Sequence, residues 1–162
     1  MTSARTRLAA DAWAAILQAH AALVPLLDRQ LQAEVELPLT WYDVLLELSA
    51  APDGRLRMSD LSDRVVLSRT RVSRLVDELA AAGLLTKEQN PDDRRSAHAV
   101  LSPLGAARQQ AAAPAYLRSI KQRVAGSLSD DELRTIALAL RKAVTAHSEA
   151  EKVKSGGSTR SP

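Results

Sequence analysis

The feature that most constrains the fold is a short amphipathic segment at residues 69–82. Ser68, a favoured helix N-cap, precedes the segment, and Gly83, suited to the left-handed conformation that ends helices, follows it. Four apolar residues recur at the spacing of one helical face: Val72, Leu75, Val76 and Leu79. The opposite face carries Thr70, Arg74, Asp77 and Ala81, with Arg71 and Ser73 on its flanks. We therefore predict a helix that is buried along one stripe and open to a partner along the other.

A second, shorter helix is predicted immediately before this one. Ser59 is a suitable N-cap for residues 60–66, in which Leu61 and Val65 are apolar. Leu67 then lies in a tight turn that leads to Ser68. Two helices joined by such a turn form a helix-turn-helix, whose second helix can enter the major groove of DNA.

The residues after Gly83 predict a β-hairpin. Strand-like stretches at 84–89 and 97–102 flank the polar hexapeptide 90–95, and this is the pattern of two strands joined by a polar tip. Residues 55–58 are too short for a helix and are predicted to form an edge strand. A hairpin in this position would project beside the helix-turn-helix as a wing.

The rest of the chain is predicted to be helical, so the fold class is mainly α. The chain has no Phe and only 2% aromatic residues, and it is rich in Ala and Leu, which are strong helix formers. Thr40 is a plausible N-cap, and Ser129 with Glu132 matches the capping-box pattern. A Ser-, Gly- and Lys-rich tail at 149–162 is predicted to be disordered. The additional helices are expected at 8–34, 41–50, 103–124 and 130–146.

Several classes of protein are excluded or disfavoured by what the sequence lacks. There is no Cys, so disulfides, thiolate metal sites and thiol redox sensing are ruled out, and a reducing cytoplasm is the expected location. The six glycines cannot assemble a phosphate-binding loop, and the three histidines lack metal-site spacing. We expect no metal, no cofactor, no transmembrane span and no catalytic motif of a hydrolase or transferase.

A local basic patch suggests a polyanionic partner. The net charge is only +3, but residues 64–74 contain four arginines and no acidic residue. Arginine can make bidentate contacts with guanine, and hydroxyl groups bond either bases or phosphates. Arg94 and Arg95 at the hairpin tip could place an arginine in the adjacent minor groove. Arg64 could equally be a surface ion-pair residue.

The sequence resembles the MarR family of regulators over roughly residues 8–147, most densely at 58–105. The resemblance rests on Met58-Ser59-Asp60-Leu61-Ser62, on Leu67 to Leu79, on Ala82-Gly83-Leu84-Leu85, on the wing Asp92-Asp93-Arg94-Arg95-Ser96, and on Val100 to Gly105. The Asp-x-Arg wing signature, fulfilled by Asp93 and Arg95, makes it specific.

This resemblance implies a single MarR-like domain over 1–162 that acts as a homodimer. Helices 8–34 and 103–147 would form the dimerisation region, and 40–102 would form the winged lobe. A pseudo-palindromic operator on double-stranded DNA is implied, commonly bound by a repressor that a small ligand relieves. By the same resemblance Arg95 would enter the minor groove and Arg94 would contact a phosphate or the minor groove. The groove-reading residues would come from Ser68, Arg69, Thr70, Arg71, Ser73 and Arg74.

Two acidic residues near these arginines are expected to support them. A carboxylate that faces phosphates is repelled, so Asp77 is predicted to pair with Arg74, three residues away, or with a wing arginine. Asp93 is predicted to brace Arg95. Neither residue is expected to contact DNA.

The few aromatic residues have two interpretations. They lie on the helices that would join the lobe to the dimerisation region, so core packing is the simpler role. The alternative is an effector pocket, by resemblance to family members that bind aromatic acids. The candidates for this pocket are Trp13, His20, Trp41, Tyr42 and Tyr116.

A winged helix can also serve as a protein-contact module, which is the main alternative to DNA binding. Arginines on both the second helix and the hairpin tip argue against this alternative. We therefore predict a non-enzymatic, sequence-specific DNA-binding regulator.

Overall fold

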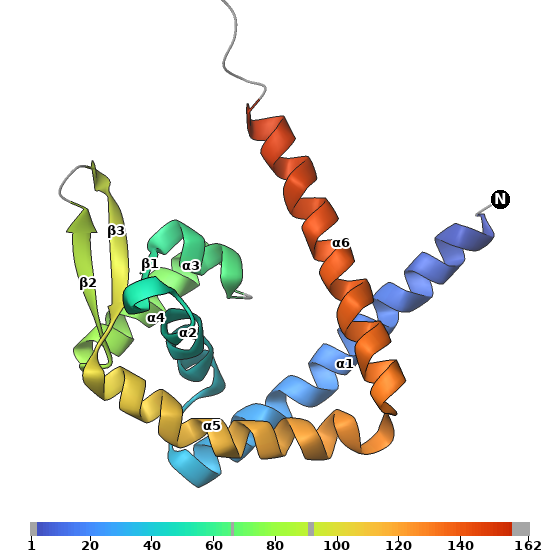
Figure 1. The fold of residues 1–162 in the computed structure, drawn as a ribbon, viewed down its shortest axis with the longest axis horizontal. Helices are drawn as coiled ribbons and strands as arrows, with labels where there is room; N and C mark the ends of the chain where they lie inside the picture. Colours follow the sequence, from blue (N-terminus) through green and yellow to red (C-terminus); the bar gives the residue numbers. More distant parts are fainter. Residues whose placement is uncertain (1–2, 66, 91–92, 157–162) are drawn as a thin grey trace, which may run out of the picture. The chain divides into compact units, whose positions relative to one another are not determined.

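The computed structural model describes residues 3–65, 67–90 and 93–156, in a chain that divides into two compact units at Ile120. Each unit is described by itself. The predicted mainly helical fold with a small sheet is confirmed (Figure 1). The elements are α1 (Ala4–Val35), α2 (Leu39–Ser49), η1 (Pro52–Gly54), β1 (Arg55–Arg57), α3 (Met58–Arg64), α4 (Arg69–Ala81), β2 (Leu85–Asn90), β3 (Asp93–Leu101), α5 (Pro103–Arg123), η2 (Ala125–Ser127) and α6 (Asp130–Gly156).

Helix α4 is the predicted amphipathic helix. The Ser68 hydroxyl accepts a hydrogen bond from the Arg71 N–H at 3.4 Å, and Gly83 has a φ of 73° just beyond the end of the helix. The apolar stripe of α4 is buried in the core of the first unit: Val72, Leu75, Val76 and Leu79. Local signals alone therefore placed this helix and its buried face correctly.

Helix α3 starts earlier than we predicted. It begins at Met58 and ends at Arg64, and the preceding Arg57 makes no capping hydrogen bond with its side chain. Ser59 therefore lies inside the first turn and is not the N-cap, and its hydroxyl donates to the Asp60 carboxylate at 3.1 Å. Val65, which we placed inside the helix, follows its end and is buried.

The wing is a longer hairpin than the sequence suggested. Strand β3 is central in an antiparallel sheet of order β1-β3-β2, with Leu56 opposite Ala99 on one side and Lys87 opposite Ala99 on the other. The predicted edge strand at 55–58 is confirmed as β1, although it ends at Arg57 and Met58 begins α3. Strand β3 starts at Asp93 rather than 97, since backbone pairing in an exposed ribbon does not require apolar side chains.

The start of α2 differs from our prediction in a way that matters for the site. Helix α2 begins at Leu39, so Thr40 lies within the first turn and is not the N-cap. Pro38 occupies the cap position and has no side-chain acceptor, and the Asp28 carboxylate of α1 accepts the Leu39 N–H at 2.8 Å instead. This bond fixes the start of α2 against α1.

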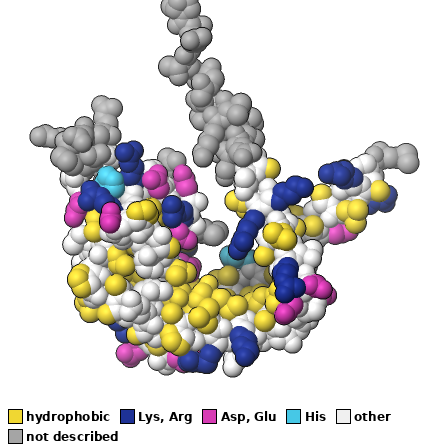
Figure 2. Space-filling view, viewed as in Figure 1, with side chains coloured by type: hydrophobic (Ala, Val, Ile, Leu, Met, Phe, Trp, Pro, Cys, Tyr) yellow, Lys and Arg dark blue, Asp and Glu magenta, His cyan; other side chains and the backbone are white. Residues whose placement is uncertain are grey.

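Helix α1 packs on the lobe only through its C-terminal part, where Leu27 and Leu31 are buried. Residues 4–22 are exposed, including Leu8 at 69% and Trp13 at 60%. Hydrophobic side chains are visible on the surface of α1 in Figure 2. We expected no membrane span, but by length and composition alone α1 is long and apolar enough to cross a membrane. Core helices of soluble proteins meet the same two criteria, so the finding is weak evidence for a membrane.

Helix α5 begins against the lobe through a close backbone approach. The Ser102 hydroxyl accepts the Gly105 N–H at 3.0 Å and donates to the Gly83 carbonyl at 2.7 Å. An added Cβ at Gly105 would lie 1.9 Å from the Leu84 carbonyl oxygen. Glycine is therefore required at this position because there is no room for a Cβ atom, and not because of its backbone conformation.

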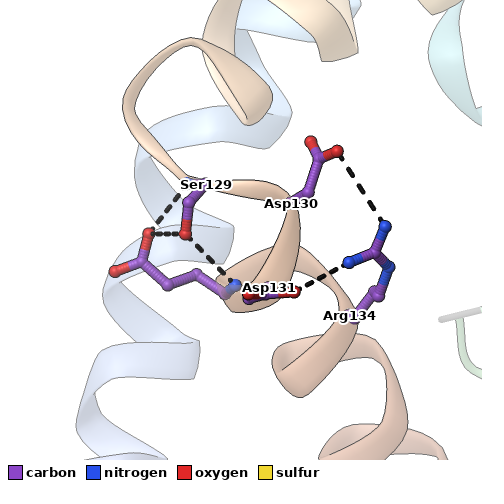
Figure 3. Close-up of polar contacts among 5 residues, drawn as sticks. Ser129, Asp130, Asp131 and Arg134 are labelled. Atoms are coloured by element: carbon purple, nitrogen blue, oxygen red, sulfur yellow. Dashed lines mark hydrogen bonds and ion pairs between the residues drawn. The ribbon is translucent and has the colours of Figure 1, made fainter.

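The second unit consists mainly of α6, and its predicted capping box is present (Figure 3). The Ser129 N–H donates to the Glu132 carboxylate at 2.8 Å, and the Glu132 N–H donates to the Ser129 hydroxyl at 3.4 Å. The Ser129 hydroxyl also donates to this carboxylate at 2.7 Å, and the two bonds that Ser129 donates lower the pKa of Glu132. Helix α6 ends at Gly156 rather than near Ala146, so it includes residues 149–156 that we assigned to a disordered tail. Residues 157–162 lie outside the described part of the chain.

Candidate nucleic-acid interface

The exposed face of α4 carries the side chains that we predicted to read DNA. Thr70, Arg71 and Arg74 are exposed, Ser68 is exposed at the N-cap, and Ser73 is half-buried. Within the described residues neither Arg71 nor Arg74 takes part in an ion pair. The helix therefore presents two unneutralised guanidinium groups, each with several N–H donors, near its positive N-terminal end.

A groove of about 540 Å³ runs along this face of α4 and is closed on one side by the start of α2. From α2 it is lined by Thr40 and Trp41, and from the segment around α4 mainly by polar residues. The remaining lining residues are Pro38, Leu67, Ser68, Thr70, Arg71, Arg74, Leu75 and Glu78. The groove is thus formed by two helices, whereas we had placed the candidate interface on α4 and the wing alone.

Glu78 is a residue of this groove that our sequence analysis missed. Arg71, Arg74 and Glu78 stand at i, i+3 and i+7, the spacing of one helical face, and this signal was available in the sequence. Glu78 stands four residues after Arg74, yet no ion pair joins them among the described side chains. The groove therefore has a cationic N-terminal part and a carboxylate further along α4.

The predicted pairing of Asp77 with Arg74 is wrong, and the alternative of a wing arginine involves side chains outside the described part of the chain. The Asp77 carboxylate accepts a hydrogen bond from Lys87 Nζ at 3.0 Å instead. Lys87 belongs to β2, which packs against α4, so the partner comes from the sheet rather than from the same helix. The consequence is that Arg74 has no ion-pair partner among the described side chains, while Asp77 ties strand β2 to helix α4.

Arg64 is an ion-pair residue, the alternative that the sequence left open. Its guanidinium lies 3.5 Å from the Glu47 carboxylate of α2. A further ion pair joins Arg55 of β1 to Glu88 of β2 at 2.6 Å, across the intervening strand β3. These pairs hold α3 and the base of the wing in place. Arg71 and Arg74, by contrast, form no ion pair with any described side chain.

The remaining predicted contacts fall where side chains are not described. The backbone of Asp93, Arg94 and Arg95 lies in β3, and that of Arg69 begins α4, but their side chains lie outside the described part of the chain. The roles of these three arginines, and of Asp93 as a brace for Arg95, therefore stay predictions.

The five candidate pocket residues lie in different surroundings. Tyr42 and Tyr116 pack together in the core with ring centroids 4.6 Å apart, and burial raises the pKa of both. The Tyr42 hydroxyl accepts a hydrogen bond from Gln109 at 3.5 Å. Trp41 lines the groove, and Trp13 is exposed on α1.

His20 lines a separate cavity of about 680 Å³ between α1 and the helix-turn-helix. Asp28 and Asp43 contribute carboxylates to it, and Arg71 of α4 also reaches it. Burial, with a smaller contribution from the nearby Glu47 charge, raises the pKa of Asp43 to about 6. Of the five candidates, only His20 lines this cavity.

The paired helices α3 and α4, followed by the hairpin of β2 and β3, define a winged helix-turn-helix protein. Residues 36–96, which hold most of this lobe, match the sequence model of the MarR family. The chain is similar to MarR family transcriptional regulators, in this lobe by sequence and over most of its length by fold. The resemblance stated from the sequence is thereby confirmed. A comparison with curated proteins gave no match.

Three solved MarR family regulators illustrate the similarity, each 27% identical to the chain. Sco3205 from Streptomyces coelicolor, determined in complex with DNA, has a TM-score of 0.76, and the match covers 90% of both chains. AbsC, also from Streptomyces coelicolor, has a TM-score of 0.75 over 93% of this chain and 98% of its own. A regulator from Silicibacter pomeroyi has a TM-score of 0.74 over 90% of this chain and 99% of its own.

Proposed function

We propose that the protein is a transcriptional regulator that binds a pseudo-palindromic DNA operator as a homodimer, most simply as a repressor. The observation that carries the proposal is that the two faces of α4 differ in character. One stripe of this helix is buried in the lobe, and the opposite face presents Arg71 and Arg74 without ion-pair partners among the described residues. A helix with this arrangement can lie in the major groove with its cations on base edges and phosphates. The structural similarity to Sco3205, determined with DNA, supports the same reading.

The homodimer is proposed from the exposed apolar residues of α1 and α6. Leu8, Trp13 and Leu17 of α1 are half or more exposed. In α6 the residues Ile136, Leu140 and Val144 recur every four positions and are also exposed. A monomer rarely leaves such faces uncovered, and a second copy can bury them. Two recognition helices related by a two-fold axis would then enter major grooves about 34 Å apart.

The wing would add minor-groove contacts through Arg95, with Arg94 beside it and Asp93 as the brace. Because each arginine that contacts phosphate displaces counterions, we expect Arg95→Ala to weaken operator binding and to flatten its salt dependence. Circular dichroism should show an unchanged fold. Wild-type affinity of this variant in a fluorescence titration would remove Arg95 from the interface.

A small-molecule effector is proposed to bind in the cavity lined by His20, Asp28 and Asp43. Its volume of about 680 Å³ is in the range of small-molecule sites, and it lies between α1 and the helix-turn-helix. The protein would act in the cytoplasm, and it would need no cofactor and catalyse no reaction.

Selection of bound duplexes from a random pool tests the proposal most directly. A recovered palindrome with half-sites one helical turn apart is expected, because the two-fold axis of the dimer imposes the symmetry. Titration with random duplex at two salt concentrations is the companion measurement. A protein-contact module would show neither binding nor a steep salt dependence, and that result would refute DNA binding.

A further inference from the structure

The groove beside α4 contains hydrogen-bond donors from α2 that the DNA-reading helix does not account for. Thr40 and Trp41 lie in the first turn of α2 and line the groove opposite Ser68, Thr70 and Arg71. Among the described residues, no hydrogen bond is made by the Thr40 hydroxyl or the Trp41 indole N–H. Both side chains are half-buried, and Trp41 also packs against the core, so their positions are fixed by the lobe.

The chemistry of this part of the groove fits an anion with several oxygen acceptors. One guanidinium, three hydroxyl groups and one indole N–H, from two different helices, surround the same space. Arg71 supplies the positive charge, and it has no carboxylate partner among the described residues. A phosphodiester carries one negative charge and exposed oxygens, and such contacts hold a protein in register on a duplex.

The position of the anion along the groove follows from the residues that line its two ends. Glu78 lines the groove further along α4, and its carboxylate repels an anion. Thr40 and Arg71 line a second cavity together with Leu67, which precedes α4, so Thr40 lies near the start of α4, where the N–H groups of the first turn also favour negative charge. The anion is therefore expected at this end.

We infer that a DNA backbone phosphate occupies the groove between α2 and α4, held by Thr40 and Trp41 together with Arg71. This inference rests on the proposed DNA-binding function and adds α2 to the interface. Thr40 and Trp41 would position the protein on the duplex without reading sequence. Their contribution should therefore be equal for an operator and for random DNA.

The first test compares Thr40→Val with Thr86→Val. Both changes remove one hydroxyl at similar volume, but Thr86 is exposed on β2 and does not line the groove. Thr40→Val should weaken binding about tenfold for each subunit, or about a hundredfold for the dimer, since a hydrogen bond to a charged group is lost in each subunit. The loss should be the same for the selected duplex and for a mixed-sequence duplex, and the salt dependence should stay unchanged because no charge is removed. Equal affinities of the two variants would overturn the inference.

The second test separates a phosphate contact from a merely structural effect. A methylphosphonate, which is uncharged, replaces each phosphate of the selected duplex in turn. At one position in each half-site, wild-type binding should fall while binding of Thr40→Val falls much less, because the contact is already lost. Equal losses for wild type and variant at every position would mean that Thr40 touches no phosphate, and the inference would then be wrong.

The third test uses Trp41 as a reporter. The chain has two tryptophans, so Trp13→Phe leaves Trp41 as the only one. Saturating duplex should change its emission, whereas inorganic phosphate at matched ionic strength should not. A response to inorganic phosphate alone would assign the groove to a free anion and overturn the inference. Duplex binding without any change in Trp41 emission would overturn it while leaving the proposed function intact. Failure of the wild type to bind any duplex would refute both.

Discussion

Gly105→Ala should meet the closest contact of any Gly→Ala change in the first unit of the chain. The new Cβ would lie 1.9 Å from the Leu84 carbonyl oxygen and 2.9 Å from both the Leu84 carbonyl carbon and Leu101 Cδ1. Carbon and carbonyl oxygen normally approach no closer than about 3.3 Å, so the start of α5 must move by about 1.4 Å. The contact is with backbone, so no side chain can turn away to relieve it.

The cost can be worked out from three contributions. Overpacking against a rigid neighbour costs about 3 kcal/mol, the upper end of the usual range. The displacement also lengthens the 3.2 Å hydrogen bond from the Ser102 N–H to the Leu84 carbonyl, worth about 1 kcal/mol. Against this, alanine is a better helix former than glycine by about 1 kcal/mol. The free energy of unfolding should therefore fall by about 3 kcal/mol.

Gly126→Ala is the matched control, because it adds the same methyl group where there is room. The nearest atom to its Cβ would be the Lys121 carbonyl oxygen at 3.8 Å, an ordinary contact. This variant should be unchanged or more stable by up to about 1 kcal/mol, through loss of unfolded-state entropy. Urea unfolding followed by far-UV circular dichroism, at one protein concentration, measures both. A Gly105→Ala loss no greater than that of the control would refute the close-approach argument.

Three further predictions concern the site and the assembly. Asp43→Asn should raise Tm at pH 7.5 and lose this advantage near pH 4. The Asp43 carboxyl has a pKa of about 6 in the folded protein and an ordinary value of 3.8 in the unfolded chain, so the folded protein binds this proton more tightly. The stability of the wild type therefore falls as the pH rises through that interval. An advantage that persists at pH 4 would contradict this. Arg74→Ala should weaken operator binding about tenfold or more and random-duplex binding much less, since a base contact is lost; equal losses would make Arg74 a phosphate contact only. Leu140→Asp should give monomers in sedimentation, while Thr145→Asp, on the opposite side of α6, should not; a dimeric Leu140 variant would exclude that stripe from the interface.

The parts of the fold that were predictable are those fixed by neighbouring residues. Helix α4 was found because its cap, its apolar period and its terminal glycine lie within sixteen residues, from Ser68 to Gly83. The Ser129 and Glu132 capping box was found for the same reason. Each signal is complete within one or two helical turns, so no tertiary contact is needed to read it.

The errors occurred where a partner came from elsewhere in the chain. The acceptor for the start of α2 is Asp28, eleven residues before Leu39, so Thr40 was mistaken for the cap. Asp77 pairs with Lys87 because of how β2 packs on α4, and a sequence pattern does not show that packing. The end of α6 was misjudged because residues 149–162 were interpreted as a disordered tail rich in Ser, Gly and Lys. Glu149, Glu151, Lys152 and Lys154 are in fact good helix formers.

The same misreading explains why the groove was overlooked. With Thr40 taken as a cap, its hydroxyl had an assigned hydrogen-bond donor, and Trp41 was weighed only as a core or effector-pocket residue. Once Asp28 supplies the acceptor for the start of α2, Thr40 has no structural task among the described residues and faces the groove. A local assignment thus hid a candidate functional residue.

The groove beside α4 and the cavity lined by His20 share part of their lining, which connects the proposed phosphate site to the proposed effector site. Pro38, Thr40, Leu67 and Arg71 line both spaces. An effector changes DNA affinity only through different affinities for the free and DNA-bound forms, and the coupling is reciprocal. Arg71 can supply that difference directly, because one guanidinium cannot bond a phosphate in the groove and a carboxylate or ligand in the cavity with full strength at once. Coupling in this lobe therefore needs no displacement of a whole domain, only competition for one side chain at the start of the recognition helix.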